Sequence, residues 1–156
     1  MGTSAGGIAV GGAITQMPSL FRAALIRVGL TNALRFETTE GGPANVGEFG
    51  TVTNQADFNA ILAMDAYQHV KQGVNYPAVM LTAGVQDHRV PIWVSAKMTA
   101  RLQAAGRNKG PVLLRAEDDA GHGGLGLGRA QEDAEWADSF AFLFWQLGAA
   151  GFQPTK

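Results

Sequence analysis

Three short apolar runs constrain the fold of this chain more than any other feature. They cover residues 23–28, 77–84 and 111–116, and each has the length and composition of a buried strand. Segments with apolar residues at helical spacing separate the runs. Strands that alternate with helices form a parallel sheet with right-handed crossovers. The pattern therefore predicts an α/β fold, with a parallel sheet of about three strands and flanking helices.

The segments between and around the runs predict four helices, over residues 5–16, 57–67, 90–105 and 129–147. Asp57 is the expected N-cap of the second helix. The last helix carries large apolar side chains on one stripe, which we interpret as core packing. The residues of this stripe are Trp136, Phe140, Leu143, Phe144 and Leu147.

Residues 37–53 are rich in Gly, Thr and Asn, with Gly41-Gly42-Pro43 at the centre. A stretch of this composition and length is typical of an irregular loop. Long loops within compact domains are often functional. We therefore expect a surface excursion near a site.

The overall composition excludes several classes of protein. With 156 residues, 46% hydrophobic and 16% charged, the chain is long and apolar enough for one domain with a buried core. A formal net charge of −1 provides no basic field for nucleic acid. No apolar run approaches about 18 residues and no signal peptide is recognisable, so neither membrane insertion nor secretion is indicated. The compartment stays open, with the cytoplasm as the default. Without cysteine there is no thiolate chemistry.

The chain opens with Gly2-Thr3-Ser4-Ala5-Gly6-Gly7, which contains the pattern G-x-S-x-G. This pattern is typical of a sharp strand-to-helix turn that exposes a nucleophilic serine. Glycines permit the bend because they carry no Cβ. The alternative is a Gly-Ser turn in which Ser4 only caps the following apolar helix. The motif is short, so its interpretation depends on residues downstream.

Two further candidates follow the second and third predicted strands. Asp87 follows residues 77–84, and His122 follows residues 111–116 in a Gly-rich turn. The carboxyl ends of parallel strands meet at one edge of a sheet, where α/β proteins place their chemistry. The order Ser4, Asp87, His122 is that of the α/β-hydrolase triad. These three side chains are therefore expected to converge.

Other interpretations of these residues stay open. His69 lies in a polar segment and is expected on the surface, while His88 can be a pH-sensitive surface group or a partner of the adjacent carboxylate. A histidine flanked by glycines, such as His122, is often structural, and Asp118 and Asp119 can cap its loop. No His or acidic residues occur at metal-ligand spacing, so we expect neither a metal nor a cofactor.

The chain resembles the C-terminal part of the catalytic domain of the prolyl oligopeptidase family, serine peptidase family S9. The resemblance covers nearly the whole chain and lies in residues 2–7, 18–24, 27–29, 48–50, 76–84, 87–91 and 120–123. It implies six site residues: Ser4 as nucleophile, Asp87 as triad acid, His122 as base, the Ala5 N–H as oxyanion donor, Arg89 as a contact to a substrate carbonyl, and Val90 as a pocket wall.

The resemblance implies a serine hydrolase that transfers acyl groups to water. By our alignment, the aromatic pair that stacks a substrate proline in this family falls at Ala60 and Met64, so proline specificity is not implied. The family domain also places strands and a second oxyanion donor before the nucleophile. We therefore expect activity on short-chain esters, with weak or no peptidase activity. The alternative is a non-catalytic fragment of a larger S9 peptidase that is stable only through association.

The resemblance also implies the domain organisation. Residues 1–150 are expected to form a truncated α/β-hydrolase domain that starts at the serine turn, and residues 151–156 a tail. The strand predicted from Ala23 to Val28 is then an open, apolar parallel edge. Such edges pair with other strands. We therefore expect a homo-oligomer, or association with another chain through this edge, and a small ester or peptide as substrate.

Overall fold

The computed structural model describes residues 1–106, 108 and 110–154. Its centre is a four-stranded parallel sheet in the order β1-β2-β3-β4. The strands are β1 (Gly2–Thr3), β2 (Ala23–Arg27), β3 (Ala78–Gly84) and β4 (Val112–Glu117). The predicted α/β class and the three predicted strands are confirmed. The expected number of strands was one too low, because β1 is too short to show a periodic pattern.

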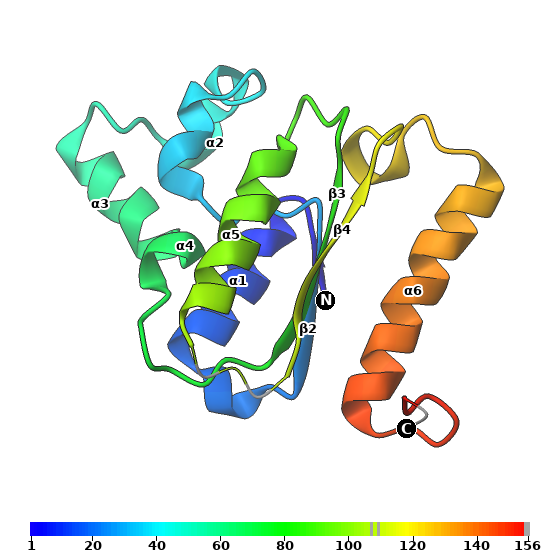
Figure 1. Ribbon diagram of the computed structural model, residues 1–156. Coiled ribbons are helices and arrows are strands. Elements are labelled where there is room, and N and C mark those ends of the chain that lie inside the picture. The colour runs from blue at the N-terminus through cyan, green and yellow to red at the C-terminus, as the bar shows by residue number, and fades with distance from the viewer. Residues whose placement is uncertain (107, 109, 155–156) are drawn as a thin grey trace.

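Helices lie on both sides of the sheet (Figure 1). One side carries α1 (Gly6–Gln16), α3 (Gln55–Met64), α4 (Ala66–His69) and α5 (Ile92–Ala104), and the other carries α6 (Arg129–Leu147). The remaining helical segments are short: α2 (Val46–Phe49) and the 3-10 turns η1 (Pro18–Leu20), η2 (Ala33–Thr38), η3 (Pro43–Asn45) and η4 (His122–Gly124). Among the described residues, no helix combines the length and apolarity needed to cross a membrane.

The larger buried cluster forms between the sheet and the α1/α5 side, and a smaller one forms between the sheet and α6. Every residue of β3 is buried, as expected for the central strand of a parallel sheet covered on both faces. Its side chains pack with those of β2 and α5, including Ile26, Leu81, Met98 and Leu102. This packing fixes the register of β2 and β3, and with it the loops at their carboxyl ends.

The predicted helix over residues 57–67 is wrong at both ends. The helix begins at Gln55 because the Asn54 side chain accepts the N–H groups of Ala56 and Asp57, at 2.8 and 3.1 Å. Asp57 is therefore not the N-cap, and its carboxylate accepts the Thr51 N–H instead. At the other end, extended backbone at Asp65 separates α3 from α4.

The apolar stripe predicted for α6 faces the core only in part, since Leu143 packs against the buried cluster of Leu25, Ala78, Met80 and Phe142. Phe140, Phe144 and Leu147 are 48%, 43% and 63% exposed. The buried residues of the helix are Glu135, Ser139 and Phe142. The physical reason lies on the sheet, where Arg27 and Thr82 provide hydrogen-bond partners for the inward Glu135 carboxylate.

The predicted tail, residues 151–156, is described only as far as residue 154. Phe152 packs against Phe144 with the ring centroids 4.8 Å apart. The Gln153 side chain donates to the carbonyls of Trp145 and Ala149. This part of the tail therefore packs back on α6. Residues 155 and 156 lie outside the described residues.

The edge of β2 is less open than expected. In the register of the sheet, β1 pairs with Ile26 and Arg27. Within the described part of the chain, Ala23, Ala24 and Leu25 have no strand beside them on that side. The unpaired edge is therefore confined to the first half of β2.

The Glu135 carboxylate makes the fold sensitive to acid. Burial acts to raise the pKa of Glu135, but hydrogen bonds from Arg27 and Thr82 and the charges of Arg27 and Arg115 outweigh it and lower the pKa below 4.5. Arg115 in turn pairs with Glu117 and Asp138. The stabilisation from Glu135 is thus fully present above its unfolded pKa and is lost as the pH falls through its lower folded pKa.

We predict that Glu135→Gln lowers the free energy of unfolding by about 3 kcal/mol at pH 7, because it leaves the buried Arg27 without a counter-charge. The difference from wild type should stay constant down to about pH 5 and shrink at lower pH. Urea unfolding monitored by circular dichroism across this pH range measures the free energy of unfolding of both proteins at each pH. A difference that grows as the pH falls would contradict the prediction.

Candidate active site

Ser4 occupies a strained turn between β1 and α1. Its φ is +55°, a conformation that is costly for a residue with a side chain. Backbone hydrogen bonds hold the turn: the Ser4 N–H donates to Arg27 O and the Leu30 N–H donates to Ser4 O, both at 2.9 Å. Glycines permit the close approach, since a Cβ at Gly2 would collide with the next turn and one at Gly7 would lie 2.7 Å from the Gly29 Cα. The turn therefore projects Ser4 from the carboxyl edge of the sheet.

Asp87 lies in the turn after β3, with its side chain fully buried. One carboxylate oxygen, Oδ1, accepts the backbone N–H groups of Arg89 and Val90, at 2.9 and 2.8 Å. These two bonds fix the orientation of the carboxylate. They leave its second oxygen, Oδ2, directed at His122.

The His122 imidazole lies between the other two predicted residues. Its Nδ1 is 2.8 Å from Asp87 Oδ2, and its Nε2 is 2.9 Å from Ser4 Oγ. The ring is largely buried, with 14% of the side chain exposed. A carboxylate facing Nδ1 favours the tautomer with the proton on that nitrogen, which leaves Nε2 free to accept the proton of the Ser4 hydroxyl. The structure thus brings Ser4, His122 and Asp87 into one chain of hydrogen bonds.

The turn that carries His122 is held against β3 by a close backbone contact. A Cβ at Gly84 would collide with the Ala120 carbonyl, and the Gln86 N–H donates to the same carbonyl at 2.9 Å. The Gly121 N–H closes the turn by donating to Leu125 O at 2.6 Å. Gly123 and Gly124, directly after His122, have φ of +67° and +93°, a backbone conformation that favours glycine.

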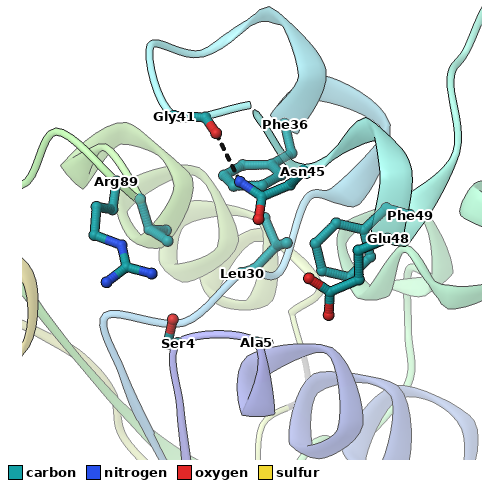
Figure 2. A pocket seen from close by; sticks show the side chains of 10 residues that line it. Ser4, Ala5, Leu30, Phe36, Gly41, Asn45, Glu48, Phe49 and Arg89 are labelled. Carbon is teal, nitrogen blue, oxygen red and sulfur yellow. Dashed lines mark hydrogen bonds between the residues drawn. The ribbon is translucent and has the colours of Figure 1, made fainter. Parts of the chain in front are cut away.

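A cavity of about 140 Å³ opens beside Ser4 (Figure 2). Its walls come from the turn between β1 and α1, from the segment between β2 and α3, and from the loop after β3. The lining residues are Ser4, Ala5, Leu30, Phe36, Gly41, Asn45, Glu48, Phe49, Arg89 and Val90. The predicted contact residues Ala5, Arg89 and Val90 all border this cavity.

The structure locates the two residues at which our alignment placed the aromatic pair of the family. Ala60 and Met64 belong to α3 and do not line the described cavity. The aromatic walls are instead Phe36 and Phe49, whose rings meet edge to face at 6.1 Å. Sequence reasoning missed these two residues, although it expected a functional excursion over residues 37–53, where Phe49 lies.

The structure also shows the surroundings of His69 and His88 and bears on the possibility of a metal site. His69 is half-buried and thus less exposed than expected. His88 is exposed and its Nδ1 lies 2.9 Å from Glu40 Oε2, so its partner is Glu40 and not the adjacent Asp87. Among the described residues, no group of His, Asp and Glu side chains is arranged to hold a metal ion.

Comparison with known proteins identifies relatives of this chain. Dipeptidyl aminopeptidase BI from Pseudoxanthomonas mexicana is 33% identical over 153 residues, which are 96% of this chain and 21% of that protein. Prolyl endopeptidase from Elizabethkingia meningoseptica is 33% identical over 148 residues, 94% of this chain and 21% of that protein. The chain therefore spans about a fifth of the length of these relatives.

Comparison with solved structures also finds a prolyl endopeptidase and a prolyl oligopeptidase. A solved structure from a study of two prolyl endopeptidases superposes with a TM-score of 0.83 and 33% identity, covering 99% of this chain and 21% of that one. Prolyl oligopeptidase B from Galerina marginata, bound to a 35mer hydrolysis and macrocyclization substrate, gives a TM-score of 0.82 at 28% identity over 93% of this chain. The sequence model of the prolyl oligopeptidase family matches residues 1–150. This chain belongs to the prolyl oligopeptidase family.

Proposed function

We propose that this chain is a serine hydrolase that transfers acyl groups from small esters to water, with Ser4 as nucleophile, His122 as base and Asp87 as triad acid. One observation carries the proposal: a single imidazole contacts both the Ser4 hydroxyl and the buried Asp87 carboxylate, at 2.9 and 2.8 Å. Membership of a family whose matched relatives are peptidases supports it.

The reaction follows from the order of these contacts. Ser4 Oγ attacks the substrate carbonyl while His122 Nε2 takes the hydroxyl proton. Asp87 stabilises the imidazolium that forms, and its own position is held by two backbone N–H groups. The imidazolium then protonates the leaving group. In the second half of the reaction, His122 activates a water molecule that releases the acyl group and restores Ser4.

The developing oxyanion needs hydrogen-bond donors. The Ala5 N–H lies at the start of α1, where helix N–H groups have no partner within the helix, and we assign it as one donor. Each oxyanion donor is worth about 2.7–4 kcal/mol of transition-state stabilisation. With one donor assigned, the chain should favour activated short-chain esters over peptides, whose leaving amines require more help. Arg89 and Val90, which border the cavity, are proposed to contact the substrate carbonyl and the acyl group.

We predict that Ser4→Ala abolishes hydrolysis of p-nitrophenyl acetate and covalent labelling by a fluorophosphonate, because both require the Ser4 oxygen. The matched control is Ser19→Ala, which removes another serine hydroxyl, at an exposed position in η1. It should leave both signals at the wild-type level. Hydrolysis and labelling that persist in Ser4→Ala would refute the assignment of the nucleophile.

The alternative function is a non-catalytic part of a larger S9 peptidase that is stable through association. The observation that favours it is coverage, since the chain spans only 21% of its relatives. The fluorophosphonate assay separates the two hypotheses. Labelling with ester turnover supports the hydrolase, labelling without turnover indicates a formed Ser–His pair without oxyanion stabilisation, and the absence of both supports the non-catalytic alternative.

The open part of the β2 edge supports association with another chain, and we propose a homo-oligomer. The Arg22 carbonyl accepts a hydrogen bond from Ala78 on the β3 side. Since successive backbone groups alternate in direction along a strand, the N–H of Ala23 points to the open side. Pairing with a strand of a second copy would satisfy this group and cover the apolar edge.

We predict that the chain elutes as a dimer or larger species in size-exclusion chromatography at micromolar concentration. Ala23→Pro should shift it toward monomer, because proline removes the outward N–H. Ala23→Val, which keeps this N–H, should behave as wild type. A monomeric wild-type protein, measured with light scattering, would contradict the proposed homo-oligomer without affecting the proposed chemistry.

A further inference from the structure

A buried carboxylate on α6 connects the chain segments that carry Ser4, Asp87 and His122. Oε1 of Glu135 accepts hydrogen bonds from Arg27 Nε in β2 and from Thr82 Oγ1 in β3, both at 2.9 Å. The two ends of the ion pair are nearly inaccessible, with 11% of the Arg27 side chain and 9% of the Glu135 side chain exposed. The Glu135 carboxylate thus joins the two central strands, β2 and β3, to α6.

Arg27 is the link to Ser4. It pairs with Thr3 across the β1–β2 register, and its carbonyl accepts the Ser4 N–H at 2.9 Å. Its guanidinium is held on two sides, by the Glu135 carboxylate and by the Trp136 ring, whose centroid lies 4.0 Å from Cζ. A displacement of the Arg27 backbone therefore moves the serine turn directly.

Thr82 is the link to Asp87. It lies near the carboxyl end of β3, the strand that ends at Gly84 and continues into the Asp87 turn. Its carbonyl accepts the Val28 N–H at 2.8 Å, directly after Arg27. The same residue therefore contacts Glu135 through its side chain and β2 through its backbone.

The link to His122 runs through α6 itself. The helix begins shortly after the η4 turn that contains His122 (Figure 1). A Cβ at Gly124 in that turn would lie 3.5 Å from Glu132 Oε1, so the turn rests against the first turns of α6. Glu135 anchors these turns to the sheet.

From this arrangement we infer that Glu135 is a positioning residue for the proposed acyl-transfer reaction, which holds the His122 turn at hydrogen-bond distance from both Ser4 and Asp87. Its side chain does not contact the reacting atoms and acts through Arg27, Thr82 and the α6 backbone. Because the inference depends on the proposed function, its test combines a catalytic with a spectroscopic measurement.

The test compares Glu135→Gln with Asp138→Asn on the complete chain. Asp138 lies on the same helix, but its ion pair with Arg115 is solvent-exposed on the Asp138 side. Two quantities are measured: kcat and KM for p-nitrophenyl acetate, and the low-field proton NMR signal of the His122 ring N–H bonded to Asp87.

Glu135→Gln should lower kcat about tenfold, because small displacements of reacting groups cost up to about a hundredfold in rate. KM should change less than about twofold, since only the transition state is affected. The His122 signal should broaden or disappear. Asp138→Asn should retain wild-type kcat and signal. If Glu135→Gln is less stable yet also retains both, Glu135 only stabilises the fold and the inference is overturned.

A milder variant keeps the test decisive if Glu135→Gln does not fold. Thr82→Val preserves side-chain shape and removes one hydrogen bond to the carboxylate without leaving a charge unpaired. It should weaken kcat and the His122 signal together, and wild-type values of both would overturn the inference. If the wild-type chain hydrolyses no ester, the proposed function fails, whereas the NMR comparison still tests whether Glu135 positions His122.

Discussion

Backbone-to-backbone contact at glycines is the constraint on which the arrangement at the carboxyl edge of the sheet depends. Gly7 packs against the Gly29 backbone, and Gly84 packs against the Ala120 carbonyl, at distances that leave no room for a Cβ. These contacts draw the loops after β1, β2, β3 and β4 together. Side-chain hydrogen bonds of 2.8 and 2.9 Å between Ser4, His122 and Asp87 are then possible without any of the side chains having to extend far.

A second level of organisation comes from buried polar groups. The Glu135–Arg27 ion pair lies between the sheet and α6, at a place where hydrophobic packing alone would be expected. Buried ion pairs add little stability compared with apolar packing, but they specify geometry because each charge requires its partner. Here the specified geometry is the distance between α6 and the ends of β2 and β3.

The sequence predicted features that depend on local pattern and chain order. The positions of β2, β3, β4 and α6 follow from apolar runs and helical spacing, and the order of Ser4, Asp87 and His122 follows the strands. It did not predict β1, whose two residues are too few for a period. It placed the N-cap of α3 at Asp57. The N-cap is Asn54, whose side chain accepts the backbone N–H groups of Ala56 and Asp57.

The larger errors concern contacts between distant segments. Hydrophobicity predicted the inward face of α6 only in part, because Glu135 also faces inward and contacts a sheet residue 108 positions away. The aromatic residues of the cavity were not identified from the sequence: Phe36 and Phe49 lie in η2 and α2, two short helical segments between β2 and α3. These segments of six and four residues are too short for a periodicity from which side-chain direction can be derived, so such contacts become visible only in three dimensions.

The two N–H groups that hold one oxygen of Asp87 also determine the polarity of the whole hydrogen-bond chain. An asparagine at this position would have to offer its carbonyl oxygen to those donors, and its NH₂ group would then face Nδ1. The imidazole would be driven into the opposite tautomer, with a hydrogen on Nε2 pointing at the hydroxyl of Ser4. The side chain would be almost isosteric, yet Nε2 could no longer accept a hydrogen bond from the Ser4 hydroxyl, so shape alone does not make position 87 replaceable.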